Sequence, residues 1–211
     1  MTYPSDLLST CPEKRLVNEG AANLVDPSKP GVCVVLDANG LATAKSLILK
    51  GVKPEDIIIP QADPAEAALM EEEAIELGVQ LWNMDMYNAL DFASHRSIKL
   101  LSIDSCGWWY SEKGKFKCVH AILEKACKDK KLADGCVIRM TVYAKGRGAL
   151  TTDECIMDML GISHTLANEG QYMYQAYPAD MWSKGHGMAY VYGRRGGEMV
   201  NMIGKVYQYT K

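Results

Sequence analysis

Short apolar runs alternate with amphipathic stretches along most of this chain. Runs such as Val32-Cys33-Val34-Val35-Leu36 are continuous, which is typical of strands buried on both faces of a parallel sheet. Between the runs, apolar residues recur at helical spacing, most clearly over residues 116–132. The pattern predicts strands over residues 32–36, 57–59, 79–82, 98–103 and 136–140.

The helices of the first half have recognisable start and stop signals. In Asp63-Pro64-Ala65-Glu66, Asp63 is suited to the N-cap position, Pro64 to the first helical position and Glu66 to the third, and Gly78 ends the predicted helix. Further helices are predicted over residues 41–50, 116–132 and 151–168.

After residue 168 the pattern changes to strands only. Strands are predicted at 172–175, 188–192 and 199–209, and Arg194-Arg195-Gly196-Gly197 supplies a hairpin turn. Because crossovers between parallel strands are right-handed, we predict an α/β fold. It is a three-layer α-β-α sandwich with a mostly parallel, seven-stranded sheet and a C-terminal antiparallel hairpin. We assign residues 1–30 to an N-terminal segment and residues 31–211 to a single domain.

Composition limits the functional classes. The 211 residues include 23 basic and 26 acidic side chains, which gives a net charge of −3. We therefore do not expect broad binding to duplex nucleic acid. No apolar run approaches the ~20 residues of a membrane span, and residues 1–30 lack a secretory signal pattern, so we expect a cytoplasmic protein. The 7 cysteines are an odd number without a C-x-x-C pair, which predicts buried free thiols.

Acidic residues follow four predicted strand ends. They are Asp37, Asp63, Asp85 and Asp104. The carboxyl ends of parallel strands meet at one edge of the sheet, where ligands bind at the topological switch point. Helix capping accounts for Asp63, but capping alone does not explain the other three. We therefore expect a functional site at this edge.

The chain resembles the class I S-adenosylmethionine-dependent methyltransferases from Val32 to Tyr209. The resemblance lies in the order of elements, in the turn VVLDANG after the first strand, and in the closing hairpin. It implies a Rossmann-like methyltransferase fold and S-adenosylmethionine as cofactor. It implies that Gln61 or Asp63 binds the ribose and that Asp85 and Met86 meet the adenine. The other implied cofactor residues are Asp37, Ala38, Asn39, Gly40 and Asp104, the last facing the reactive methyl group.

Physical chemistry agrees with this resemblance. Methyl transfer is an in-line displacement at a sulfonium carbon, so the protein must hold a cation and orient a nucleophile. Acidic strand ends suit a cation. The absence of G-x-G-x-x-G disfavours NAD and FAD, and the absence of G-x-x-x-x-G-K-[ST] argues against a P-loop nucleotidase. The fourth strand ends in DSCG instead of [DNS]-P-P-[YFW], which argues against N-methylation of nucleic-acid bases.

Aromatic residues near the expected methyl-transfer point suggest the acceptor. They are Trp108, Trp109 and Tyr110 on one loop and Trp182 on a second. Aromatic faces suit a planar ring or a sugar, so we predict O-methylation of a hydroxyl on a glycan or other small molecule. Asp104 or His186 is the predicted general base. Assistance by a divalent metal bound at Asp104 is a further alternative.

Two alternatives remain. An RNA or protein acceptor would use a basic rim at Arg194-Arg195 and Lys113-Lys115-Lys117. A non-catalytic Rossmann-like module would pair with a partner enzyme. The chain is also compatible with being one domain of a longer protein.

Overall fold

The computed structural model describes residues 12–104, 119–143, 152–177, 190–194 and 197–209. Its helices are α2 (Pro12–Leu24), α3 (Ala42–Leu49), α4 (Pro64–Leu77), α5 (Met86–Phe92), α6 (Val119–Lys128) and α7 (Thr152–Glu169), with a 3-10 turn at Pro54–Asp56. Its strands are β1 (Val32–Val35), β2 (Ile57–Pro60), β3 (Gln80–Trp82), β4 (Ile98–Asp104), β5 (Leu132–Tyr143), β6 (Tyr172–Tyr177), β7 (Tyr190–Arg194) and β8 (Gly197–Gln208).

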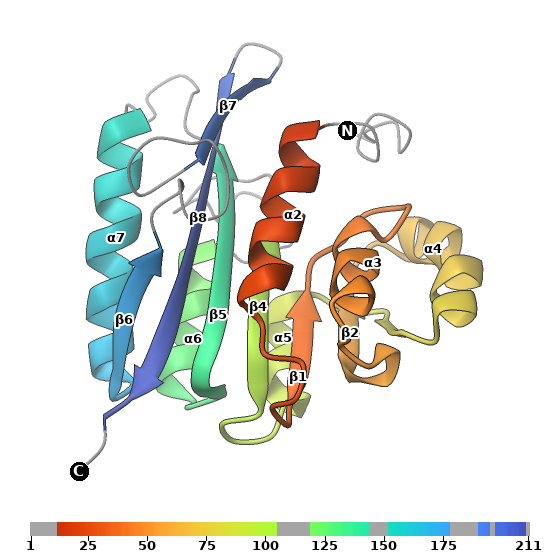
Figure 1. Cartoon of the computed structure of the whole chain (residues 1–211), viewed down its shortest axis with the longest axis horizontal. Helices are drawn as coiled ribbons and strands as arrows, with labels where there is room; N and C mark the ends of the chain where they lie inside the picture. Colours follow the sequence, from red (N-terminus) through yellow and green to blue (C-terminus); the bar gives the residue numbers. More distant parts are fainter. Residues whose placement is uncertain (1–11, 105–118, 144–151, 178–189, 195–196, 210–211) are drawn as a thin grey trace.

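The strands form one mixed sheet in the order β3-β2-β1-β4-β5-β8-β6, with β7 paired to β8. The first five strands are parallel, whereas β8 runs antiparallel to β5, β6 and β7. Helices α2 and α3 cover one face and α5 and α6 the other (Figure 1). This confirms the predicted α/β three-layer sandwich with its mostly parallel sheet and C-terminal hairpin. The strand order contains seven strands, and β7 is an eighth that pairs with β8. The strand order reverses between β1 and β4, which is where a ligand crevice is expected.

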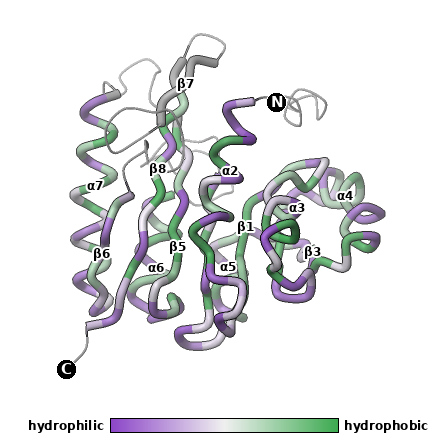
Figure 2. Tube along the Cα trace, in the orientation of Figure 1, coloured by the Kyte–Doolittle hydropathy of each residue, from purple (hydrophilic) through white to green (hydrophobic). Residues whose placement is uncertain are grey.

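Two apolar clusters hold the layers together, one on each face of the sheet. The tube in Figure 2 shows green, hydrophobic segments concentrated in the strands and on the inner sides of the helices. On α6, all of the positions at the predicted helical spacing are buried: Val119, Ile122, Leu123, Ala126 and Cys127. The amphipathic pattern was therefore a correct guide to the core-facing side of this helix.

The cysteine prediction is confirmed within the described residues. Cys33, Cys127, Cys136 and Cys155 are free and buried, and the other three cysteines lie outside the described ranges. Burial raises the pKa of Cys33 and Cys127 to about 12. Among the helices described, none is long and apolar enough to cross a membrane.

Two helices were not predicted. Helix α2 lies in the segment 1–30 and packs against α3 and β5, and α5 follows β3 directly. The buried face of α2 includes the apolar residues Val17, Ala21 and Ala22, together with the polar residues Lys14 and Asn18. A helix whose buried stripe contains two polar side chains has a weak apolar periodicity, which explains why the sequence did not reveal it.

Candidate functional site

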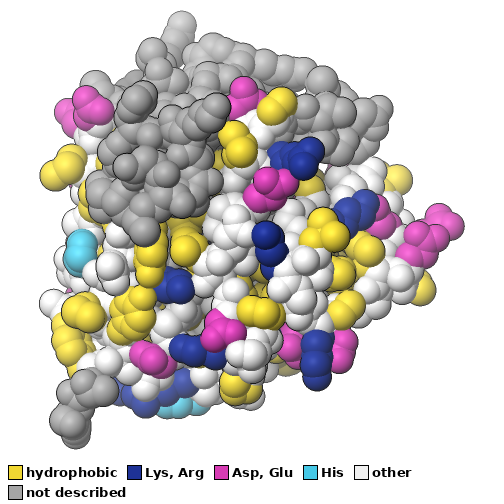
Figure 3. Space-filling view, in the orientation of Figure 1, with side chains coloured by type: hydrophobic (Ala, Val, Ile, Leu, Met, Phe, Trp, Pro, Cys, Tyr) yellow, Lys and Arg dark blue, Asp and Glu magenta, His cyan; other side chains and the backbone are white. Residues whose placement is uncertain are grey.

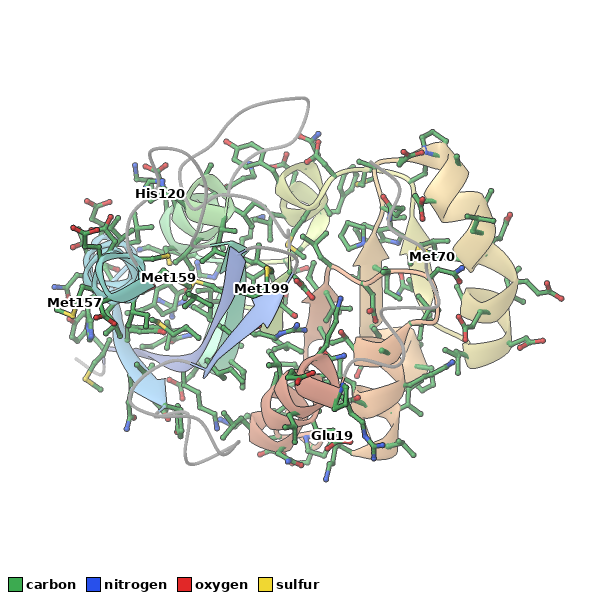
Figure 4. The ribbon with its side chains drawn as sticks, turned by 90° about the horizontal axis from the view of Figure 1, so that it is seen from above. Glu19, Met70, His120, Met157, Met159 and Met199 are labelled. Atoms are coloured by element: carbon green, nitrogen blue, oxygen red, sulfur yellow. The ribbon has the colours of Figure 1, made fainter. Side chains whose placement is uncertain are left out.

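A cavity of about 250 Å³ opens at the carboxyl ends of β1, β2 and β4. This is the reversal point of the strand order, where the parallel topology predicts a ligand crevice. Seen from the carboxyl-end side in Figure 4, α2 and α3 lie on one side of the sheet and α6 on the other. The cavity is lined by Leu36, Asp37, Pro60, Gln61, Ala62, Asp85, Met86, Tyr87, Asp104 and Ile122. The structure therefore brings together Asp37, Gln61, Asp85, Met86 and Asp104, as predicted.

Asp37 holds the turn that connects β1 to α3. Its Oδ2 accepts hydrogen bonds from the backbone N–H groups of Thr43 (2.9 Å) and Ala44 (3.0 Å), and its Oδ1 accepts one from Ala38 N–H (3.2 Å). The turn needs left-handed backbone at Gly40 (φ 91°) and Leu41 (φ 42°). The carboxylate thus satisfies the first N–H groups of α3.

Burial raises the pKa of Asp37 above its usual value, because desolvation disfavours the charged form. The hydrogen bond from Ala44 and the nearby charges of Lys14 and Arg139 act in the opposite direction. The predicted cofactor residues Ala38, Asn39 and Gly40 belong to this turn but are not among the residues that line the cavity.

The structure distinguishes between the two candidates at the end of β2. Gln61 lines the cavity, whereas Asp63 caps α4 by accepting a hydrogen bond from the Ala65 N–H (2.9 Å) and is not part of the lining. The side-chain oxygen of Gln61 accepts from the Asp63 N–H (3.1 Å), which orients its carboxamide. Gln61 is therefore the better-placed of the two for a ligand in this cavity.

Asp85 and Met86 begin α5 at the cavity wall. Asp85 is the N-cap, and its two oxygens accept from the backbone N–H and the side-chain amide of Asn88, both at 2.8 Å. Met86 is buried and faces the cavity together with Ile122 of α6. Next to them, the Lys125 ammonium lies 4.8 Å from the centre of the Tyr87 ring.

Asp104, at the end of β4, forms two buried ion pairs through one oxygen. Its Oδ2 lies 3.1 Å from Lys14 Nζ and 3.0 Å from Arg139 Nη2. The side chains are 4% exposed for Asp104, 9% for Lys14 and 1% for Arg139. Two cations on one oxygen stabilise the charged carboxylate, and protonating it would weaken both ion pairs.

Arg139 connects Asp104 to Asp37. Its Nη1 donates to Ser102 Oγ (3.2 Å) and to Thr43 Oγ1 (3.4 Å), and the Thr43 hydroxyl in turn donates to Asp37 Oδ1 (3.3 Å). We call Lys14, Asp37, Asp104 and Arg139 the charge quartet. Within the quartet, the negative charge of Asp104 is compensated directly by Lys14 and Arg139.

The sequence did not indicate Lys14 or Arg139 as site residues. Lys14 lies in the segment that received no predicted element. Arg139 interrupts the apolar run Cys136-Val137-Ile138-Arg139-Met140, and a charged residue inside a buried strand was the signal available. Buried charges are almost always paired, so this arginine implied an acidic partner.

Several predicted residues lie outside the described ranges. They are Trp108, Trp109, Tyr110, Trp182 and His186. Within the part of the chain that the structure describes, no group of three or more His, Cys, Asp or Glu side chains could hold a metal ion.

Comparison with known proteins gives structural neighbours only. No family model matches the chain, and no curated protein matches it by sequence. Trm1 from Pyrococcus horikoshii in complex with S-adenosyl-L-methionine is similar with a TM-score of 0.64 and 11% identity, covering 99% of this chain and 59% of that one. The chain therefore spans less than two thirds of the length of Trm1.

Two further structures are similar over 99% of this chain. TYW2 from M. jannaschii in complex with AdoMet has a TM-score of 0.59 and 13% identity, and 78% of its chain is covered. An rRNA methylase from Streptococcus thermophilus has a TM-score of 0.55 and 12% identity, and 99% of its chain is covered. At these identities the likeness concerns the fold, and this chain has the Rossmann-like methyltransferase fold.

Proposed function

We propose that this protein is an S-adenosylmethionine-dependent methyltransferase with an RNA acceptor. The observation that carries the proposal is the cavity at the reversal point of the strand order, lined by Asp37, Gln61, Asp85, Met86 and Asp104. Two similar structures are complexes with this cofactor, which supports the same ligand here.

The lining residues suit a nucleoside. Leu36, Met86 and Ile122 supply apolar surface for a planar ring, and Gln61 and Asp85 supply polar groups at the ends of neighbouring elements. We assign the ribose contact to Gln61 and the adenine contact to Asp85 with Met86. The bound cofactor supplies the methyl group on a sulfonium, and the chain's own groups orient it and exclude water.

The charge quartet changes the role that we propose for Asp104. A general base must take up a proton, and a proton on Asp104 would weaken its ion pairs with Lys14 and Arg139. We propose that Asp104 is a fixed charge in the cavity wall and that His186 is the general base.

RNA is favoured as the acceptor because one of the similar structures is an rRNA methylase. The hydroxyl acceptor on a glycan or other small molecule was predicted from aromatic residues outside the described ranges, and none of the three structures compared above supports it. On the face seen in Figure 3, basic and acidic side chains of the described residues are interspersed. The described residues on this face therefore present no single-sign surface for broad electrostatic binding.

Cofactor binding tests the first half of the proposal. Isothermal titration should detect S-adenosylmethionine binding to the wild type, and Asp85→Ala should weaken it by about 1–3 kcal/mol if the carboxylate bonds the adenine amine. Asp63→Ala is the matched control, since it also removes an N-cap but lies outside the cavity. No binding of the cofactor at millimolar concentration would exclude the methyltransferase and leave the non-catalytic module.

Transfer of a radiolabelled methyl group tests the acceptor. Total RNA, a protein extract and a mixture of sugars are offered in parallel with labelled cofactor. Label in the RNA fraction is the expected result. Label only in the sugars would restore the glycan O-methyltransferase, and label only in protein would favour the protein alternative.

A further inference from the structure

Helix α2 contributes a charged side chain to the wall of the cavity. The helix runs antiparallel to β1, so its first turn lies near the carboxyl ends of the strands (Figure 1). Lys14, in that turn, is buried and reaches Asp104 at the end of β4. Asp104 lines the cavity, so this ion pair brings a side chain of α2 to the wall of the site.

The apolar contacts of α2 are small. Its buried apolar residues are Val17, Ala21 and Ala22, whereas Leu16 is 38% exposed. Leu24, at the end of α2, is partly buried and packs against the apolar cluster that contains Ala21 and Ala22. Free energy from burial scales with apolar area, so a valine, two alanines and a partly buried leucine hold a 13-residue helix only modestly. Elements with few buried apolar contacts have a low free energy of local unfolding compared with the rest of the protein.

The interface beneath α2 also contains unsatisfied polar atoms. Within the described residues, Asn18 Oδ1 and Arg139 Nε are buried and have no hydrogen-bond partner. Each such atom costs free energy. A buried ion pair is itself weak evidence for stability, because desolvation offsets most of its attraction. The polar content of this interface therefore needs a reason other than stabilising the helix.

We propose that Lys14 is a positioning residue for the cofactor cavity. Together with Arg139 it fixes the carboxylate of Asp104 in the cavity wall, and through this ion pair the docking of α2 is coupled to occupancy of the cavity. The inference rests on the proposed function. Coupling of this kind is reciprocal: if the docked helix strengthens cofactor binding, cofactor binding stabilises the docked helix by the same factor.

The test compares wild type, Lys14→Met and Arg15→Met, with hydrogen exchange and calorimetry on each. Arg15 is the matched control, since it is the next residue on α2 and its side chain is 78% exposed, paired with Glu19. In the wild type, S-adenosylmethionine should slow amide exchange across α2. In Lys14→Met the cofactor should bind about 5- to 150-fold more weakly, the usual range for coupled sites, and should no longer protect α2. Arg15→Met should match the wild type in both measurements.

A merely structural lysine would behave differently. Lys14→Met would then have a lower melting temperature but an unchanged cofactor affinity, which would overturn the inference. Lys14→Arg keeps the positive charge and should bind the cofactor with wild-type affinity. This second variant tests the inference even if Lys14→Met folds poorly. If the wild type binds the cofactor and α2 exchange is unchanged, only this inference fails. If the wild type binds none, the proposed function fails and this inference with it.

Discussion

Removing Arg139 should destabilise the protein more than any surface substitution. Arg139 is fully buried and pairs with Asp104 at 3.0 Å while donating to Ser102 at 3.2 Å. Deleting one partner of a buried ion pair costs about 3–5 kcal/mol, because the remaining charge stays buried. In Arg139→Met the aliphatic stem is retained and Lys14 still faces Asp104, so we expect the lower end, about 3 kcal/mol. For a domain of this size, that loss corresponds to a melting temperature lower by about 6–12 °C.

Urea unfolding at pH 7, followed by circular dichroism, measures the loss directly. Arg15→Met is the control, since an exposed i,i+4 pair contributes about 0.3–0.5 kcal/mol. If Arg139→Met lowered the free energy of unfolding no more than the control does, Arg139 would not compensate the buried carboxylates. The argument from the charge quartet would then be wrong.

Two other features of the fold give measurable expectations. Burial raises the pKa of Asp37 above 3.8, so the folded state binds its proton more tightly than the unfolded state and wild-type stability falls as pH rises above that value. Relative to Asp37→Asn, wild-type stability should thus fall as the pH rises from about 4 in urea titrations, and a difference that is flat with pH would contradict this. Gly204→Ala places a Cβ within 2.6 Å of the Tyr174 ring and should cost about 1–3 kcal/mol. Gly161→Ala on α7 meets no atom within 4 Å and should gain up to about 1 kcal/mol, so equal effects in the same unfolding assay would refute the steric argument.

The sheet could be predicted because its strands are buried on both faces. Ile57-Ile58-Ile59 is continuously apolar, and Ile98–Ile103 is apolar except for Lys99 and Ser102 and does not alternate strictly, which is typical of central parallel strands. Helix α4 was clear for a different reason, since Asp63 and Gly78 are its N-cap and C-cap in the structure. In both cases the information is local, within one element and its two ends.

Helices α2 and α5 were missed for two different reasons. Helix α5 has 7 residues, too few to establish a helical period. The buried stripe of α2 includes Lys14 and Asn18, whose burial depends on what the helix covers. The covered feature is the end of β4, about 90 residues later in the chain, and single-sequence patterns contain no such information.

The sequence predicted where the site lies in the fold, but it did not predict how the charges in the site are paired. Parallel topology places the residues after each strand at one edge, so Asp37, Gln61, Asp85 and Asp104 line a common cavity. The prediction that these acids attract a cationic donor treated them as unpaired. In the structure, Asp37 caps α3 and Asp104 pairs with Lys14 and Arg139.

These pairings change what can select the ligand. The field of Asp104 offers little attraction for a sulfonium, because two bases, Lys14 and Arg139, lie about 3 Å from its carboxylate. Among the described lining residues, Asp85 is the acid outside the quartet, and its oxygens are fixed by Asn88. Discrimination among ligands then falls to hydrogen bonds at Gln61 and Asp85 and to the apolar walls. On the proposed function, such a cavity would recognise its nucleoside by shape and hydrogen bonding, with the carboxylate of Asp104 held in the wall by its two ion pairs.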